Sequence, residues 1–437
     1  MKIQLLAGAA CAALIGFATP ALGASPSNVP PATSVAAPST QAAVDAYYAR
    51  RSGTLLWLRN GASSPAATSL LQTLRRAPLD GFESGPALAS QAEALLARAS
   101  AGDRAAIAGA DRLLSTAWVM YVQNLQRPPS GMTIADGWAA PRLQSPQEIL
   151  LQTAAASSVA AHVQAVSSVN PIYAQLRDAA WQQAQSSGGS ADPRVLANLD
   201  RVRAMPFQER YVMVDAGSAR LWMVQDGRIV DSMKVIVGKP TTPTPMVAST
   251  IYYATLNPYW NVPQDLVQKL IAPRVLDQGI TYLKDHSYEV LSDYGSDAEP
   301  IAPSKVDWRA VAAGEQVVKV RQRPGPANSM GQMKFGFPNS YDIYLHDTPR
   351  KELFAEASRD VSNGCIRLED AERLGRWLLG REPDASSPQP EQHVLLPKPV
   401  PIYVTYLTTQ ADSGQLTYLD DSYGKDGGAQ LSVASLR

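Results

Sequence analysis

Cysteine is scarce in this chain. Its 437 residues include two cysteines, Cys11 and Cys365, and Cys11 lies in an apolar N-terminal segment with the form of an export signal. An exported protein usually pairs its cysteines, because its compartment is oxidising. Once the signal is removed, Cys365 has no partner. It is therefore either an incidental, buried thiol or a thiolate nucleophile.

Net charge and metal-binding patterns are also lacking. Lys+Arg and Asp+Glu number 39 each, which argues against a general nucleic-acid binder. Neither His-Glu-x-x-His nor Cys-x-x-Cys occurs, and the four histidines lie far apart, at His162, His286, His346 and His393. A metal site therefore has little support. After the N-terminal segment, no run approaches the ~20 apolar residues of a membrane helix, so we expect no transmembrane segment in the mature chain.

The N-terminal segment predicts a signal peptide over residues 1–23. Lys2 provides the positive start, Leu5 to Phe17 the apolar core, and Ala21-Leu22-Gly23 small residues for cleavage. A lipoprotein signal modified at Cys11 is the alternative. The apolar run continues past Cys11 to Phe17, however, so this cysteine lies in the middle of the core. We expect export to the periplasm.

Composition divides the rest of the chain into a leader, a helical part, a β-rich part and a tail. Residues 24–41 are rich in Pro, Ser, Ala and Thr and predict a flexible leader. Apolar residues at helical spacing, such as Ala66, Leu70 and Leu74, predict an α-helical scaffold domain over 42–203. Ser186 to Ser190 form a predicted linker or surface loop. The β-rich domain is expected over 204–425, and a tail over 426–437.

Short β-rich runs separated by turns predict an antiparallel sheet in the second domain. Strands are expected at 211–214, 219–224, 229–230, 233–238, 249–256, 316–321, 341–346 and 401–408. Residues 257–325 would be an insertion, with a helical part at 263–285 whose apolar face is Leu266, Leu270, Ile271 and Leu276. A helix is expected over 368–379, with Leu374, Trp377 and Leu378 buried and Gly380 as its stop.

Chemistry is concentrated in the run Val361-Ser362-Asn363-Gly364-Cys365-Ile366-Arg367 and in His346, nineteen residues before the cysteine. A single thiol with a candidate base nearby is the layout for acyl transfer through a thioester. Tyr344 and His346 would share one strand face. The amides of Gly364 and Cys365 could stabilise an oxyanion, with the Tyr344 hydroxyl as a third donor. Arg367 could hold a carboxylate, although a structural ion pair is the commoner use of such an arginine.

The segment from Tyr344 to Arg367 resembles the signature of the L,D-transpeptidases of bacterial cell walls, with their YkuD-type catalytic domain. That signature is a histidine, a variable interval, and Ser/Thr-x-Gly-Cys-x-Arg. The run Val237-Gly238-Lys239-Pro240, with Thr244-Pro245, is similar to the Gly-Lys-Pro and Thr-Pro segment of the same family. The run Asn257-Pro258-Tyr259-Trp260-Asn261-Val262-Pro263 resembles the entry to the cap in the large Gram-negative, YcbB-like branch.

The resemblance implies an α+β chain, in which a helical scaffold domain precedes a β-sandwich catalytic domain with an inserted cap. It implies Cys365 as nucleophile and His346 as base, with Gly364, Tyr344, Ser362, Asn363, Arg367 and Trp260 as oxyanion or substrate-binding residues. The substrates would be donor and acceptor stem peptides of peptidoglycan, with carbapenem-type inhibitors and no metal or organic cofactor. Trp260 remains, by itself, more typical of packing than of a binding wall.

Three questions stay open at the level of sequence. Many relatives have a histidine where this chain has Asn363. The cross-links could be of the 3,3 or the 1,3 type, and the same acyl-enzyme could be resolved by water, as a carboxypeptidase or endopeptidase, or by a free D-amino acid. A non-enzymatic wall-binding scaffold is the alternative from another class, and the presence of both Cys365 and His346 argues against it.

Overall fold

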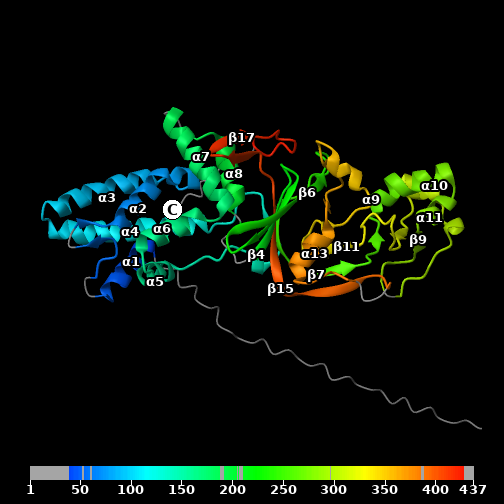
Figure 1. Ribbon diagram of the computed structural model, residues 1–437, viewed down its shortest axis with the longest axis horizontal. Coiled ribbons are helices and arrows are strands. Elements are labelled where there is room, and N and C mark those ends of the chain that lie inside the picture. Colours follow the sequence, from blue (N-terminus) through cyan, green and yellow to red (C-terminus); the bar gives the residue numbers. More distant parts are fainter. Residues whose placement is uncertain are drawn as a thin grey trace, which may run out of the picture. The chain divides into compact units, whose positions relative to one another are not determined.

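The computed structural model describes residues 39–51, 54–59, 62–187, 191–203, 205, 210–295, 297–384 and 388–427 (Figure 1). The predicted signal peptide, Cys11 and residues 24–38 of the predicted leader lie outside them. Helix α1 begins at Thr40, so the leader prediction extended two residues too far. Within the described ranges, no helix is long and apolar enough to cross a membrane.

The first part of the described chain is mainly helical, as expected. Asp103 caps α4 by accepting from the amides of Ala105 and Ala106, and Ser145 forms a capping box with Glu148 at α5. Leu70, Leu74 and Trp118 are among the fully buried residues of its core. The helices are α1 (Thr40–Ala49), α2 (Pro65–Arg76), α3 (Gly85–Ser100), α4 (Arg104–Leu125), α5 (Pro146–Ala155), α6 (Val159–Ser168), α7 (Pro171–Ser187) and α8 (Pro193–Arg203).

Short elements interrupt these helices. Strands β1 (Leu58–Arg59) and β2 (Ala62–Ser63) pair with each other, and η1 (Ala77–Asp80) and η2 (Gly137–Ala139) are 3₁₀ turns. Strand β3 (Thr133–Ile134) comes from the helical part of the sequence. It joins the sheet of the second part, where it runs parallel to β7. The sequence did not predict this addition.

The second part is built on one large sheet, seen edge-on near the middle of Figure 1. Its order is β11-β12-β14-β6-β5-β4-β15-β7-β3, and β11 also pairs with β7. The strand path therefore closes on itself, and the two layers of the expected sandwich are joined. The strands are β4 (Arg210–Asp215), β5 (Arg220–Gln225), β6 (Arg228–Gly238), β7 (Val247–Leu256), β11 (Met333–Gly336), β12 (Leu345–His346), β13 (Asp360–Ser362), β14 (Ile366–Leu368) and β15 (Gln392–Thr405). Strand β13 pairs with β6, beside this path.

Helix α13 (Ala371–Leu379) follows the sheet segment that carries the cysteine and buries Leu374 and Leu378 fully. Gly380 ends it with a φ of +68°, a conformation that glycine adopts without strain. The helix begins three residues later than predicted, because Leu368 belongs to β14. Trp377 is half-buried, and the guanidinium of Arg210 lies 4.0 Å from the centroid of its ring.

Between β7 and β11 the chain forms a cap with a core of its own. A small sheet has the order β8-β10-β9, and Val267, Ile271 and Val320 are fully buried in the core of the cap. The elements are β8 (Trp260–Asn261), α9 (Gln264–Leu266), the π-helical turn η3 (Val267–Ile271), α10 (Ala272–Gln278), α11 (Thr281–Asp285), β9 (Tyr288–Leu291), η4 (Pro303–Lys305), α12 (Trp308–Ala313) and β10 (Lys319–Gln322).

The apolar face predicted for the helical part of this cap is partly wrong. Ile271 is fully buried, but Leu270 and Leu276 are 39% and 47% exposed. The buried residues are instead Val267, Ile271 and Val275. A π-helical turn accommodates more residues per turn than an α-helix, so it rotates the buried face away from the regular 3.6-residue repeat.

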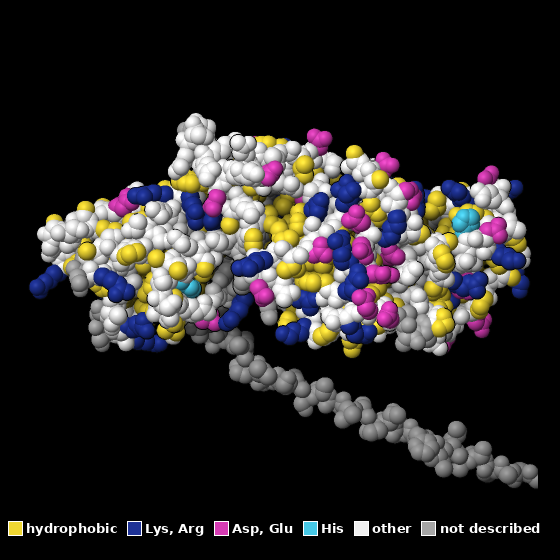
Figure 2. Space-filling view, viewed as in Figure 1, with side chains coloured by type: hydrophobic (Ala, Val, Ile, Leu, Met, Phe, Trp, Pro, Cys, Tyr) yellow, Lys and Arg dark blue, Asp and Glu magenta, His cyan; other side chains and the backbone are white. Residues whose placement is uncertain are grey.

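The described part of the chain ends with a hairpin of β16 (Thr409–Asp412) and β17 (Gln415–Tyr418), followed by residues 419–427. The remaining short element, η5 (Lys351–Ala355), lies between β12 and β13. On the face drawn in Figure 2, basic and acidic side chains are interspersed rather than gathered into separate fields. The pattern on this face agrees with the balanced formal charge.

Candidate active site

Cys365 lies at the end of a tight turn between β13 and β14. The Ser362 hydroxyl donates to the Cys365 carbonyl at 2.7 Å and accepts from the Gly364 amide at 3.1 Å. Gly364 has a φ of +117°, a region that residues with a side chain rarely adopt. One serine and one glycine therefore close the turn and present Cys365 after it.

Strand pairing brings His346 beside this turn. Strands β12 and β14 are parallel, with His346 opposite Arg367, and the Ile366 amide donates to the Tyr344 carbonyl at 3.1 Å. The rings of Tyr344 and His346 meet edge to face, with centroids 5.7 Å apart. The structure thus brings together four of the residues that the sequence singled out.

His346 is buried and held in one orientation. Its side chain is 2% exposed, and its Nδ1 lies 2.6 Å from the backbone carbonyl of Asp347. Because a carbonyl can only accept, we assign the proton to Nδ1, which leaves the Nε2 lone pair free. Burial, and next the charge of Arg367, lower the pKa of His346 to about 3. The imidazole is therefore neutral at physiological pH and can accept a proton.

Cys365 is half-buried, and its thiol reaches the Asp342 carbonyl at 4.0 Å. Burial raises the pKa of Cys365, while hydrogen bonding from the Tyr344 amide and hydroxyl, and the charge of Arg367, oppose that rise. Burial and the nearby Cys365 raise the pKa of Tyr344 as well, so its hydroxyl keeps its proton and can donate. At rest the site therefore holds a neutral thiol and a neutral imidazole.

Among the described residues, no carboxylate forms an ion pair with Arg367. Burial and the neighbouring Arg350 lower its pKa, but the pKa of an arginine starts so high that its charge persists. A half-buried guanidinium beside the thiol, with no acidic partner among the described residues, is suited to binding a substrate anion. Asn363, next to the turn's glycine, is exposed.

Three of the residues predicted to bind substrate or the oxyanion make contacts within the fold. Ser362 is 2% exposed, and both of its hydrogen bonds are internal to the turn. One of them is donated by the Gly364 amide. Trp260 is 8% exposed and packs in the core of the cap, with its ring centroid 6.3 Å from that of Tyr288.

Sequence reasoning missed the residues that support this turn from behind. The Thr244 hydroxyl donates to the Gly364 carbonyl and accepts from the Gly238 amide, both at 2.8 Å. The Lys239 amide donates to the Ser362 carbonyl at 3.0 Å. A Cβ at Gly238 would come within 2.2 Å of the Thr242 carbonyl, so only glycine fits there. The Gly-Lys-Pro and Thr-Pro segments were singled out from the sequence. Nothing in the sequence indicated that they support the turn before Cys365.

A cavity of about 660 Å³ lies elsewhere, among the helices of the first part. Several of the polar groups lining it are hydrogen-bonded within the helical part. The Tyr121 hydroxyl donates to Asp80 at 2.8 Å, and Arg203 donates to the Asn124 carbonyl at 2.8 Å. The cavity contains none of the predicted site residues, and no His/Cys/Asp/Glu group of the described residues is arranged to hold a metal ion.

Comparison with known families agrees with the site. Residues 209–402 match the family described as L,D-transpeptidase catalytic domain, and residues 42–179 match the one described as Scaffold domain. The chain therefore combines a catalytic domain of the L,D-transpeptidase family with a helical scaffold domain. The resemblance noted in the signature is confirmed, as is the predicted order of a helical part before a β-rich catalytic domain.

A Haemophilus influenzae protein to which L,D-transpeptidase activity is provisionally assigned is 28% identical over 250 residues. The matched region is 56% of this chain and 50% of that relative, so the chain spans about half of the relative's length.

Solved structures with similarity include an L,D-transpeptidase from Mycobacterium smegmatis, with 15% identity and a TM-score of 0.23, over 45% of this chain and 58% of that one. They also include the catalytic domain of the E. faecium L,D-transpeptidase acylated by ertapenem, with 14% identity and a TM-score of 0.22, over 45% and 98%. At these values the likeness carries no inference of its own.

Proposed function

We propose that this protein is a periplasmic peptidoglycan L,D-transpeptidase, an acyltransferase that works through a thioester on Cys365. The observation that carries the proposal is that β12, which ends in the buried His346, pairs with β14, which begins directly after the lone thiol of Cys365. The Nδ1 of His346 is held by the Asp347 carbonyl, on a domain that matches the L,D-transpeptidase catalytic family. Such a thiol and histidine have the parts needed for nucleophilic catalysis with general-base help.

The proposed acylation begins with attack of the Cys365 sulfur on the carbonyl at the L-centre of the third stem residue. His346 takes the thiol proton at Nε2. When the bond to the following D-residue breaks, His346 returns that proton to the leaving amine, and the thioester remains. A stem amine then attacks the thioester carbonyl, its proton passes to His346, and the thiol is regenerated as the cross-link forms.

The negative charge that develops on the attacked carbonyl oxygen needs hydrogen-bond donors. Two of the predicted donors are proposed to fill this role. The Cys365 amide has no acceptor among the described residues, and the Tyr344 hydroxyl lies beside the thiol and keeps its proton. Oxyanion donors of this kind stabilise the tetrahedral intermediate most when they are fixed before reaction. Arg367 is the proposed partner for a carboxylate of the stem.

Analysis of cell walls tests the proposal directly. Walls from a strain expressing the full chain would be digested and their stems analysed by mass spectrometry, beside walls from a strain expressing Cys365→Ala. We expect 3,3 or 1,3 cross-linked stems only with the wild-type chain. Shortened stems without cross-links would indicate a carboxypeptidase or endopeptidase, and stems that end in an exchanged D-amino acid would indicate exchange.

Labelling with a carbapenem separates an enzyme from a wall-binding scaffold. Solved relatives are described as acylated by ertapenem or in complex with imipenem, and we propose that Cys365 of this chain is acylated in the same way. Intact-mass analysis should find one imipenem adduct on the wild type and none on Cys365→Ala. A wild type without an adduct would favour the scaffold alternative.

A further inference from the structure

The Gly364 carbonyl decides where the Cys365 amide points. A trans peptide is planar, so its C=O and N–H bonds point in opposite directions. The Gly364 carbonyl accepts from the Thr244 hydroxyl at 2.8 Å on the side of the turn that faces the end of β6. The Cys365 amide, the other half of the same peptide, is thereby directed away from Thr244.

Thr244 is itself fixed at several points. It is 1% exposed, and its hydroxyl accepts from the Gly238 amide. Tyr423 closes the same segment from the other side, because its hydroxyl donates to the Gly238 carbonyl at 2.5 Å and accepts from the Thr244 amide at 3.4 Å. One tyrosine therefore holds both ends of the segment 238–244.

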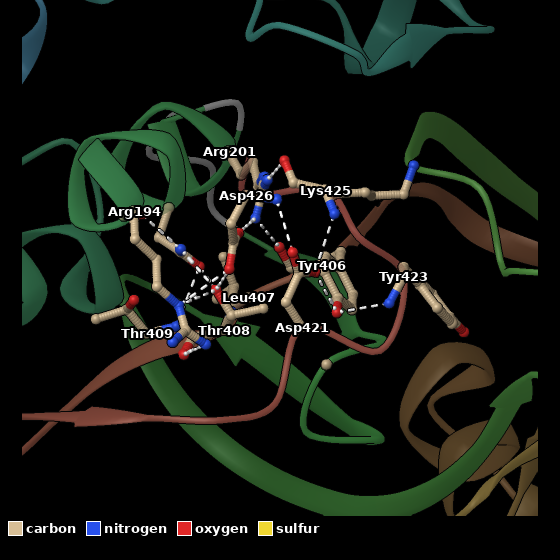
Figure 3. Close-up of polar contacts among 12 residues, drawn as sticks. Arg194, Arg201, Tyr406, Leu407, Thr408, Thr409, Asp421, Tyr423, Lys425 and Asp426 are labelled. Atoms are coloured by element: carbon tan, nitrogen blue, oxygen red, sulfur yellow. Dashed lines mark hydrogen bonds and ion pairs between the residues drawn. The ribbon is translucent and has the colours of Figure 1, made fainter. Parts of the chain in front are cut away.

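Tyr423 belongs to the C-terminal segment 421–426, which is tied down by charge and by hydrogen bonds (Figure 3). Asp426 forms ion pairs with Arg194 and Arg201 of α8, at 3.0 and 2.9 Å. The Tyr406 hydroxyl donates to Asp421 at 2.9 Å and accepts from the Tyr423 amide at 3.0 Å.

The rings of Tyr406 and Tyr423 stack with centroids 4.6 Å apart. The segment begins before the predicted tail at 426 and is part of the folded domain.

We propose that Thr244 and Tyr423 are positioning residues for the oxyanion site. Thr244 orients the Gly364–Cys365 peptide so that the Cys365 amide faces the reacting carbonyl, and Tyr423 holds Thr244 in place. Neither side chain contacts substrate in this arrangement. The inference rests on the proposed function, because it assigns these residues to acyl transfer at Cys365.

Two reagents distinguish positioning from a general structural role. Acylation by imipenem passes through an oxyanion and needs the Cys365 amide. Alkylation by iodoacetamide displaces iodide, forms no oxyanion, and depends on the thiolate and its access. Both rates are measured on the full chain at one pH, and the alkylation rate reports any change in the thiolate fraction or in access to the thiol. The thermal midpoint of each variant reports folding.

Thr244→Val removes the hydroxyl at nearly constant volume. We expect imipenem acylation to fall about 10- to 100-fold while alkylation keeps its rate, somewhat less than for complete removal of an oxyanion donor. Thr244→Ser keeps a hydroxyl and should stay within about threefold of wild type. Thr417→Val, at an exposed threonine of β17, is the matched control and should change neither rate.

Tyr423→Phe tests the same inference if the Thr244→Val variant does not fold. It should lower acylation about three- to tenfold with alkylation unchanged, since it loosens Thr244 without removing it. Tyr418→Phe, at a half-exposed tyrosine of β17, is its control. An unchanged ratio of the acylation rate to the alkylation rate in Tyr423→Phe, or an equal fall of both rates in Thr244→Val, would overturn the inference. A wild type that imipenem does not acylate would instead overturn the proposed function.

Discussion

At the scale of single residues, burial sets the ionisation of the proposed catalytic residues Cys365 and His346. It lowers the pKa of His346 to about 3 and raises the pKa of Cys365. Many reactive cysteines gain a thiolate by pairing with a protonated histidine. Here a histidine that resists protonation cannot stabilise a thiolate as an ion pair. Proton transfer to His346 is then expected to accompany attack on the substrate rather than precede it.

The pH dependence of thiol alkylation tests this ionisation. The thiol is neutral below its raised pKa, so the rate with iodoacetamide should increase about tenfold per pH unit from pH 6 to 8. A preformed thiolate–imidazolium pair would give a nearly level rate across that range. His346→Ala should show the same slope as the wild type, because His346 carries no charge there. A plateau near pH 6 would contradict the neutral pair.

Replacement of the base should affect acylation much more strongly. We expect His346→Ala to lower the rate of imipenem acylation about 10²- to 10⁴-fold, the usual contribution of a general base. His393→Ala is the matched control, since His393 is exposed on β15 and outside the site. Stopped-flow rates with both variants make the comparison. A wild-type rate in His346→Ala would leave His346 with a structural role alone.

The identities of these residues were predictable, but their contacts were not. Cys365, His346 and Arg367 follow from a lone thiol, a nearby histidine and the family signature. The burial of Ser362 was not predictable, because the direction of its hydroxyl depends on the positive φ of Gly364 two residues later. Trp260 was ambiguous for a similar reason: an indole suits a pocket wall and a core equally well, and only the packed cap decides between them.

At the scale of elements, β-rich runs between turns predicted β4 to β7 of the central sheet but not β11, β13 or β14. The prediction also failed for the segment before His346. A strand was expected over 341–346, but β12 contains Leu345 and His346 alone. Asn339 explains the difference. Its amide group donates to the carbonyls of Phe337 and Ile343, and its carbonyl oxygen accepts from the amides of Tyr341 and Ile343. One side chain satisfies the backbone that a longer strand would have used.

Asn339 therefore orders the loop whose Asp342 carbonyl meets the thiol. Asn339→Ala should remove these bonds and lower the free energy of unfolding by about 1–3 kcal/mol. It should also slow imipenem acylation severalfold, because the loop precedes Tyr344. Urea denaturation and acylation kinetics check the two effects. Asn363→Ala, which replaces an exposed asparagine near the thiol, is the control for stability and should leave it within about 0.5 kcal/mol.

At the scale of the whole molecule, the helical part contributes directly to the catalytic sheet. Strand β3 extends the sheet at β7, and the Tyr252 hydroxyl donates to Asp136 at 2.5 Å. The hydroxyls of Thr133, on β3, and Tyr341 lie 2.8 Å apart. Tyr341 belongs to the loop that Asn339 orders. Composition separated a helical domain from a β-rich one, but a two-residue strand such as β3 is too short to leave a pattern in the sequence.

The Thr133–Tyr341 contact predicts energetic coupling between the helical part and the active-site loop. Thr133→Val and Tyr341→Phe each remove one of the two hydroxyls and so break the hydrogen bond between them. In the double variant, the second substitution breaks no further bond. A double-mutant cycle on urea unfolding should therefore give a coupling of about 0.5–1.5 kcal/mol, the net value of one hydrogen bond. Because Tyr341 adjoins Asp342, each single variant should also slow imipenem acylation, and the double variant no further. Strictly additive effects would mean that the helical part and this loop are independent.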